Sequence, residues 1–346
     1  MSDPILEIRD VSKRFTKRLD VAGKIARRLG ADVSEQTVHA VDGVSLTIER
    51  GQVVGLVGES GCGKSTLGRV VAGIHPASGG SIIFEGEDLA RMPATRRRRA
   101  ALAIQMIFQD PFASLNPRMR VEDIVGEAPL VHGLVAQRRL PGYVDEVLTQ
   151  VGLDPSLKRR YPHQFSGGQR QRIGIARALA VKPKFLVCDE AIAALDVSIQ
   201  AQVLNLFMDL RERLDLTYLF ISHDLSVVEH IADRVAIMYL GRIVETAPTE
   251  ALFAEPHHPY TRALLAEAPR LDQRKRDFAP IRGEIPSPLE PPPGCHFHPR
   301  CPHADGTTCR EVVPPLEDSG PARRVACHHW RAALSQIARA EPATAP

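Results

Sequence analysis

The chain has 346 residues, and its contents of 44% hydrophobic and 25% charged residues are those of an ordinary globular protein with one to three domains. Its net charge of +3 is too small to indicate a polyanionic partner, and its aromatic content of 5% argues against a stacking platform for single-stranded nucleic acid. No apolar run approaches the ~20 residues that span a bilayer, and the N-terminus has no signal-peptide pattern. We therefore expect a cytosolic protein whose basic run, Arg96 to Arg99, is a solvated face rather than a nucleic-acid patch.

The predicted elements of residues 1–255 alternate between strands and helices. Two segments of alternating hydrophobicity, ILEIRDVSKRF and AVDGVSLTIERG, predict antiparallel strands near the N-terminus. Continuous apolar runs predict strands that are buried on both faces, and these are QVVGLVG, AIQMIF, KFLVCDE and TYLFISHD. Residues 111–162 predict a mainly helical insert, and ADRVAIMYLGRIVETA predicts a closing hairpin.

The composition changes after residue 255. EPHHPYTRALLAEAP predicts one short helix, and the segment after it is rich in Pro, Cys and His and too irregular for a sheet core. Residues 331–346 have the low-complexity composition of a disordered tail. A small extension is therefore expected to follow a larger α/β part.

The segment GESGCGKS, from Gly58 to Ser65, follows a predicted strand and precedes a predicted helix, which is the context of a phosphate-binding P-loop. Gly58, Gly61 and Gly63 allow successive backbone N–H groups to point into one concavity that holds phosphate oxygens. The following helix adds the positive end of its dipole. Lys64 then supplies a cation for the β- and γ-phosphates, and the Ser65 hydroxyl completes a Mg²⁺ shell.

Three further stretches indicate which class of phosphate-binding protein this chain is. QFSGGQRQRIGIARAL places Ser166 and two glycines ahead of a basic helix, which predicts a second anion site at a helix N-terminus. FLVCDE offers Asp189 on the Mg²⁺ side and Glu190 as a general base, and a buried strand that ended in two carboxylates without a function would cost free energy. FISHD places His223 just after another buried strand, where it could touch a γ-phosphate.

Six motifs resemble, in kind and order, those of the nucleotide-binding subunit of an ABC transporter. They are the Walker A motif GESGCGKS, the Q-loop FQDP, the signature FSGGQ, the Walker B motif FLVCDE, the D-loop AALD and the H-loop histidine. Longer stretches, such as IQMIFQDPFASLNPRM and PHHPYTRALL, resemble the ATPases of oligopeptide/dipeptide importers, most closely the subunit type usually lettered F.

The resemblance implies an α/β fold, with a P-loop ABC ATPase core made of a RecA-like sheet and an antiparallel β subdomain. It implies a nucleotide-binding domain over residues 1–255, with an α-helical subdomain at about residues 111–172. A small Cys-rich C-terminal extension is then expected over residues 256–330, before the disordered tail.

The resemblance also assigns roles to residues. Phosphate and Mg²⁺ contacts come from the Walker A residues Gly58, Glu59, Ser60, Gly61, Cys62, Gly63, Lys64, Ser65 and Thr66. Mg²⁺ is held by Ser65, Gln109 and Asp189. The hydrolytic step depends on Glu190, which polarises the attacking water, together with His223, Gln109 and Lys64 around the γ-phosphate.

Two further assignments concern the edges of the ATP site. Two nucleotide-binding subunits close head to tail, so that the signature residues Ser166, Gly167, Gly168 and Gln169 serve the partner's ATP. Phe15 is the expected adenine-stacking aromatic.

The implied partners are two transmembrane permease subunits, a second ATPase subunit and an extracytoplasmic solute-binding protein, with no nucleic acid. The protein would then lie peripherally on the cytoplasmic face of the inner membrane. An alternative is a soluble ABC ATPase acting on nucleic acid or ribosomes, but such chains usually carry two cassettes or a long coiled coil. A module that binds ATP without hydrolysing it is a second alternative, and intact Glu190 and His223 argue against it.

Four cysteines, Cys295, Cys301, Cys309 and Cys327, lie close together in the extension. In a reducing compartment such a cluster suggests a metal centre rather than disulfides. The spacings differ from the short CxxC pairs of zinc ribbons, and four thiolates can hold either Zn²⁺ or a [4Fe–4S] cluster. Five histidines nearby could replace a ligand in a zinc site, namely His296, His298, His303, His328 and His329. The resemblance to peptide-importer ATPases favours the cluster, in a structural role.

The stretch DEAIAALD departs from the family pattern at two positions. Ala191 and Ala194 stand where the family usually has Pro and Ser. Because the metal carboxylate, the base and Asp196 are retained, we expect an active site with altered communication between the two ATP molecules.

Overall fold

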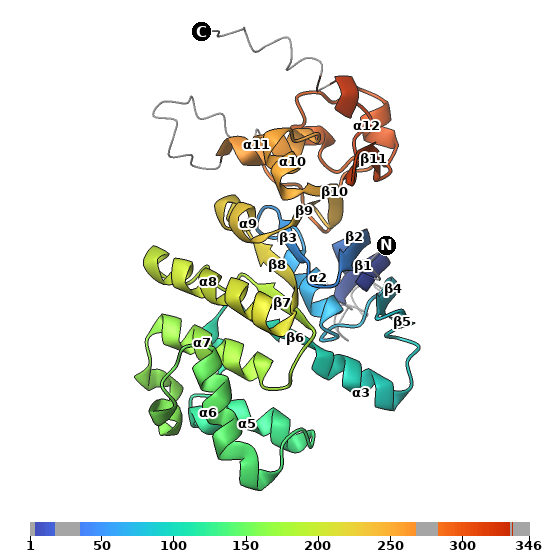
Figure 1. Ribbon diagram of the computed structural model, residues 1–346. Coiled ribbons are helices and arrows are strands. Elements are labelled where there is room, and N and C mark those ends of the chain that lie inside the picture. The colour runs from blue at the N-terminus through green and yellow to red at the C-terminus, as the bar shows by residue number, and fades with distance from the viewer. Residues whose placement is uncertain (1–3, 18–34, 268–282, 333, 335–346) are drawn as a thin grey trace, which may run out of the picture.

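The computed structural model describes residues 4–17, 35–267, 283–332 and 334 (Figure 1). A four-stranded antiparallel sheet has the order β2-β1-β4-β5. Its strands are β1 (Pro4–Lys17), β2 (Gln36–Glu49), β4 (Gly79–Phe84) and β5 (Glu87–Asp88). The pairing of β1 with β2 confirms the predicted N-terminal antiparallel strands.

The second sheet has eight strands in the order β11-β12-β10-β9-β3-β8-β7-β6. Its strands are β3 (Val53–Val57), β6 (Ile104–Ile107), β7 (Phe185–Asp189), β8 (Thr217–Ser222), β9 (Arg234–Tyr239), β10 (Arg242–Pro248), β11 (Glu317–Gly320) and β12 (Arg323–Val325). Every residue of β3, β7 and β8 is buried, as the continuous apolar runs predict for strands covered on both faces. The parallel pairing of β3 with β8 and of β8 with β7 brings the ends of these three strands to the same edge.

Helices surround the second sheet and form a separate layer at one end of the molecule (Figure 1). That layer, shown in green, consists of α4 (Pro111–Ser114), α5 (Val121–Val131), α6 (Leu140–Gln150) and α7 (Gly167–Leu179), with three short 3₁₀ turns. Residues 111–162, predicted to be mainly helical, contain α4, α5 and α6, whereas α7 lies beyond that range. The remaining helices are α2 (Lys64–Val71), α3 (Ala94–Ala103), α8 (Val197–Leu214), α9 (Leu225–Ile231), α10 (Thr249–Ala254), α11 (Pro259–Glu267) and α12 (Thr308–Glu311). None of the helices in the described ranges is long and apolar enough to cross a membrane.

The C-terminal residues continue the second sheet. β9 and β10 form the predicted antiparallel hairpin, and β12 pairs with β10 through Glu245–Val325 and Thr246–Arg324. The short strands β11 and β12 are not predicted from the sequence, because they are polar and lack an alternating pattern. The proposed boundary at residue 255 stays a prediction, but the described C-terminal residues pack on the same sheet as the P-loop strand.

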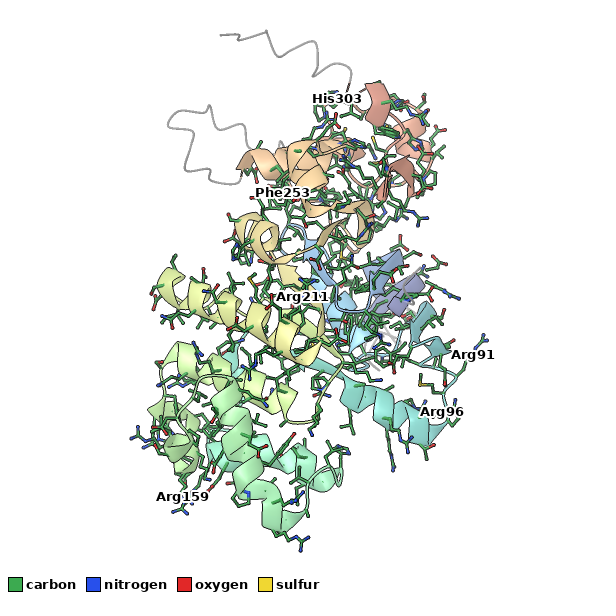
Figure 2. All side chains as sticks on the ribbon, viewed as in Figure 1. Arg91, Arg96, Arg159, Arg211, Phe253 and His303 are labelled. Carbon is green, nitrogen blue, oxygen red and sulfur yellow. The ribbon has the colours of Figure 1, made fainter. Side chains whose placement is uncertain are left out.

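The arginine run lies on α3. Arg96 forms an exposed ion pair with Glu87, and Arg97, Arg98 and Arg99 are exposed. Figure 2 shows Arg96 projecting from the outer part of the molecule, as expected for a solvated face. Residues 331–346, predicted to be a disordered tail, lie almost entirely outside the described residues.

Candidate functional site

The P-loop joins β3 to α2 in a conformation that requires glycine at two positions. Gly63 has a φ of 107°, and a Cβ there would lie 2.0 Å from the backbone oxygen of Ala40. A Cβ on Gly58 would lie 2.1 Å from the backbone oxygen of Met238. Both close approaches involve backbone, which cannot move aside as a side chain can, so the loop depends on these glycines.

Lys64 lies at the start of α2 and is only 4% exposed. Its ammonium group donates to the backbone oxygens of Gly58, at 2.7 Å, and Glu59, at 3.0 Å. A buried ammonium needs such acceptors, and phosphate oxygens are stronger ones. The loop therefore holds its cation in place for an anion to bind.

Cys62 lies within the loop, but its side chain packs in the hydrophobic core under the antiparallel sheet. Burial raises the pKa of its thiol, so it is not activated as a nucleophile. The loop residue Cys62 can therefore contribute its backbone to a phosphate site, while its side chain anchors the loop.

A buried carboxylate lies beside the P-loop. The hydroxyl of Ser65 donates to Oδ1 of Asp189 over 2.7 Å, and Asp189 is 2% exposed. Burial raises the pKa of Asp189, while the hydrogen bond from Ser65 lowers it. A hydroxyl and a carboxylate are the hard oxygen donors that Mg²⁺ prefers, so this pair fits a Mg²⁺ site.

Glu190 follows β7 with a φ of 46°, which is an unusual conformation for a residue other than glycine. Its N–H donates to the backbone oxygen of Ile221 over 3.0 Å, which ties this turn to β8. One carboxylate oxygen accepts a hydrogen bond from Nε2 of Gln109 over 2.6 Å, and the other lies 3.5 Å from Nδ1 of His223. Three motifs that are far apart in sequence thus meet at one carboxylate.

Lys64, Ser65, Gln109 and Glu190 line a pocket of about 350 Å³, whereas Asp189 and His223 contact lining residues without being part of the lining. Its lining consists of Phe15, Val38, Ala40, Ser60, Gly61, Gly63, Lys64, Ser65, Thr66, Gln109, Glu190 and Pro288. Phe15 is 39% exposed and contacts the ring of His75 edge-on, with the ring centroids 5.5 Å apart. The position of Phe15 opposite the P-loop is compatible with its expected adenine contact.

Three residues of this lining, Val38, Ala40 and Pro288, are not predicted from the sequence. Pro288 reaches the pocket because its backbone oxygen accepts a hydrogen bond from the N–H of His39 over 3.0 Å. No local pattern could predict this contact, since a Pro-rich loop gives no register against a strand so far away in the sequence.

The signature residues lie elsewhere in the chain. Ser166 is the N-cap of α7 and exchanges hydrogen bonds with Gln169, which form a capping box. Ser166 and Gly167 are exposed, and Gly168 and Gln169 are partly exposed. These four residues do not line the pocket of their own chain, so they are available to contact another molecule.

The D-loop, which follows Glu190, carries the two alanines that depart from the family pattern. Ala191 is 2% exposed, whereas Ala194 is exposed at the surface. Val197, at the start of α8, has 82% of its surface exposed.

The structure brings all four extension cysteines together. Cys295, Cys301, Cys309 and Cys327 line one small pocket, together with His258, His298, His303, His328 and His329. Figure 2 shows His303 in this C-terminal region, far from the helical layer. Burial raises the pKa of the Cys301 thiol to about 11 and that of Cys327 to about 12. Thiols with such raised pKa values are mainly protonated at neutral pH, and they would have to lose their protons on binding a metal.

One carboxylate beside this pocket, that of Asp305, is not predicted from the sequence, whereas His329 is among the histidines expected near the cysteines. Asp305 accepts hydrogen bonds from the N–H of Cys309, at 2.7 Å, and from Nε2 of His329, at 2.9 Å. The ligand atoms of Asp305, Cys309 and His329 lie within 4.8 Å of one another. The position of Asp305, four residues before Cys309, is the only signal that the sequence offers.

His258 is fixed beside the same pocket. Its Nδ1 accepts a hydrogen bond from the N–H of Tyr260 over 3.0 Å, so its proton is on Nε2. Its own N–H donates to the buried carboxylate of Glu245 over 2.8 Å. Burial lowers the pKa of His258 to about 3, so the ring stays neutral and can donate from Nε2.

Comparisons with known proteins agree with these motifs. The model of the family "ABC transporter" matches residues 41–193, and that of "Oligopeptide/dipeptide transporter, C-terminal region" matches residues 244–309. The oligopeptide transport ATP-binding protein AppF of Bacillus subtilis is 48% identical over 330 residues, which cover 94% of this chain and 97% of the relative. A probable peptide ABC transporter ATP-binding protein of Sinorhizobium fredii is 47% identical over 329 residues, which cover 95% and 90%.

Solved structures show the same fold. The structure of cbiO1 from Clostridium perfringens, part of an ABC transporter complex, superimposes with a TM-score of 0.59 at 27% identity, covering 73% of this chain and 92% of that chain. A dimeric ATP-binding cassette bound to ADP and phosphate superimposes with a TM-score of 0.59 at 23% identity, covering 70% and 98%. The α/β fold expected from the sequence, with its ABC ATPase core, is therefore confirmed.

Proposed function

The chain belongs to the ATP-binding proteins of oligopeptide and peptide ABC transporters, and on this premise we propose that it hydrolyses Mg-ATP to drive the import of peptides or related small solutes. The observation that carries the proposal is the convergence of Lys64, Ser65, Gln109 and Glu190 on one pocket. The first two come from the P-loop and α2, and the others follow β6 and β7. Such an arrangement suits phosphoryl transfer to water, in which positioning and charge stabilisation supply most of the acceleration.

Each polar group at the pocket has a proposed task. Lys64 exchanges its bonds to the loop carbonyls for bonds to phosphate oxygens, and the P-loop N–H groups hold the rest of the phosphate chain. Ser65 and Asp189, with Gln109, hold Mg²⁺, which neutralises charge on the phosphates. Glu190 polarises the attacking water, and His223, beside it, contacts the γ-phosphate.

A second nucleotide-binding subunit completes the site in this proposal. The exposed N-terminus of α7, with Ser166 and the two signature glycines, presents N–H groups to the ATP of the opposite subunit. The exposed Ala194 and Val197 lie in the same contact. This second subunit is either another copy of the chain or a different ATPase.

The remaining partners are two permease subunits and an extracytoplasmic binding protein, which place the chain on the cytoplasmic face of the inner membrane. Phe112, just after the Q-loop, is 62% exposed, and the guanidinium of Arg170 lies 3.5 Å from the centroid of its ring. An exposed aromatic residue so close to Gln109 suits a contact with the permease that moves when ATP binds.

The four cysteines are proposed to hold a metal group in a structural role. The support for this proposal is that four sulfur donors line one small pocket, although among the described residues the ligand atoms that lie within 4.8 Å of one another belong to Asp305, Cys309 and His329. A [4Fe–4S] cluster is the favoured group, since four thiolates are its usual ligands. Zn²⁺ is the alternative, and the proximity of Asp305 and His329 to Cys309 gives it a second ligand set.

Transport is tested with the permeases, the cognate binding protein and this chain reconstituted in vesicles. Uptake of a labelled peptide mixture should require ATP, and Glu190→Gln should abolish both uptake and phosphate release. ATP-dependent uptake that survives Glu190→Gln would remove Glu190 from its role. If ATP is hydrolysed but no peptide enters, another solute is the cargo, and calorimetry on the binding protein can identify it.

The metal group is tested by anaerobic purification of the full chain. Four irons per chain with a broad visible absorbance would establish the cluster. A colourless protein with one zinc would assign the site to Zn²⁺, and a protein with neither metal would overturn both assignments.

A further inference from the structure

Glu59, the second residue of the P-loop, directs its side chain away from the nucleotide pocket. Its carboxylate forms two hydrogen bonds with the guanidinium of Arg300, Nη1 to Oε2 over 2.8 Å and Nη2 to Oε1 over 3.0 Å. The Arg300 side chain is 5% exposed and that of Glu59 is 19% exposed. Paired, charge-assisted bonds with this degree of burial fix geometry far better than a surface ion pair does.

The backbone of Glu59 is held from the same side. Its N–H donates to the hydroxyl of Tyr260 over 2.9 Å. Tyr260 is fully buried and packs against the rings of Tyr239 and Phe297, with centroid distances of 4.7 Å and 5.4 Å. The P-loop is therefore held on its outer side by residues of α11 and of the cysteine-containing segment, while its inner side faces the phosphates.

Arg300 is also coupled to the cysteine pocket through the chain itself. It ends the 3₁₀ turn η4 (His298–Arg300), and the next residue is Cys301, which lines that pocket. The N–H groups of Arg300 and Cys301 donate to the backbone oxygens of Phe297 and His298, over 3.0 Å and 3.3 Å. A shift of Cys301 therefore moves the arginine that holds Glu59.

From these contacts we infer that Arg300 is a positioning residue for the P-loop, and that the occupancy of the four-cysteine site sets the affinity of the loop for nucleotide. The inference rests on the proposed binding of phosphates at Lys64 and on the proposed metal group. The C-terminal extension would then help to position the P-loop, although the two lie far apart in the sequence. Arg300 does not line the nucleotide pocket, and it reaches the P-loop through its two hydrogen bonds to Glu59.

The test is a double-mutant cycle on the full, metal-loaded chain, with the Kd for Mg-ADP measured by calorimetry. Arg300→Met and Glu59→Gln should each raise the Kd about tenfold, because each leaves a partly buried partner without its counterion. The double variant should be no weaker than either single variant, since the two residues act through one contact. Arg300→Lys, which keeps the charge but not the two-bond geometry, should lie between wild type and Arg300→Met.

A matched control is Arg310→Met, which removes an exposed arginine of the same segment and should leave the Kd unchanged. Removing the metal with a chelator should raise the Kd of the wild type severalfold and that of Arg300→Met little further. The inference would be overturned if the effects of Arg300→Met and Glu59→Gln on the Kd were additive. It would also be overturned if neither Arg300→Lys nor metal removal changed the Kd. If Arg300→Met does not fold, Arg300→Lys and Glu59→Gln still decide the question.

Lys64→Ala separates this inference from the function on which it rests. If Lys64→Ala binds Mg-ADP as the wild type does, the proposed phosphate site is wrong. If Lys64→Ala loses binding while the Arg300 and Glu59 variants keep it, only the positioning role is wrong.

Discussion

The side-chain amide of Gln109 donates a hydrogen bond to the carboxylate of Glu190 over 2.6 Å. The second oxygen of this carboxylate lies 3.5 Å from Nδ1 of His223. The proposed base is thus held by the Q-loop and the H-loop before any substrate arrives. Since the Q-loop adjoins the exposed Phe112, this hydrogen bond also connects the base to the expected permease contact.

Replacing Gln109 with Ala should lower kcat for ATP hydrolysis about 10- to 150-fold, because a hydrogen bond to a charged group is worth about 1.5–3 kcal/mol. The Kd for ADP without Mg²⁺ should change much less, since the P-loop keeps its contacts and the proposed Mg²⁺ contact of Gln109 plays no part in that measurement. Phosphate release by the assembled transporter and calorimetry on the isolated chain measure the two quantities. A kcat equal to that of the wild type would show that Gln109 does not orient Glu190.

Asp189 gives a prediction about stability and pH. Burial raises its pKa above the usual value of 3.8, so the folded chain holds this proton more tightly than the unfolded chain does. Protonation of Asp189 contributes its full stabilisation of the folded chain below pH 3.8. This stabilisation is lost as the pH rises through the raised pKa of the folded chain. At neutral pH and without Mg²⁺, Asp189→Asn should therefore unfold at a higher temperature than the wild type.

The increase in unfolding temperature caused by Asp189→Asn should become smaller as the pH falls toward 3.8, because the wild-type carboxyl then also becomes neutral. Added Mg-ATP should stabilise the wild type more than the variant, because only the wild type keeps the metal carboxylate. Thermal unfolding followed by circular dichroism measures both effects. Asp209→Asn, which changes an exposed carboxylate on α8, is the control. A variant that is less stable than the wild type at neutral pH would contradict the argument.

The chemistry around the P-loop could be predicted from the sequence because each motif there is local. A strand end, a glycine-rich turn and a helix start follow one another, and parallel pairing then brings Lys64, Asp189 and His223 to one edge of the sheet. Pro288, Arg300 and Tyr260 could not be predicted in the same way. Pro288 and Arg300 lie in an irregular segment and Tyr260 lies on the short helix α11, and no periodic pattern encodes how these parts pack against His39 and Glu59.

The D-loop alanines give a prediction about cooperativity. Ala194 is exposed on the surface that we propose for the second subunit. Ala194→Ser restores a hydroxyl, and one hydrogen bond across the interface is worth about 0.5–1.5 kcal/mol. We therefore expect a change of about two- to tenfold in the ATP concentration that gives half-maximal turnover, or a change in the Hill coefficient. Turnover and cooperativity that both stay unchanged would show that Ala194 does not affect communication between the sites.

The cysteine pocket gives the last prediction. Because burial raises the thiol pKa values, the four cysteines are poor ligands as neutral thiols and must lose protons when a metal binds. Metal affinity should therefore fall as the pH is lowered, and metal loading should release protons that can be measured in a weakly buffered solution. Cys301→Ser should reduce iron or zinc to background and lower the temperature of thermal unfolding.

Cys188→Ala removes a fully buried thiol from β7, away from the pocket, and should leave the metal content unchanged. This control separates the loss of a ligand from the loss of any buried cysteine. Equal metal content in Cys301→Ser and wild type would remove Cys301 from the ligand set. In that case Asp305 and His329, which lie beside Cys309, become the residues to replace next.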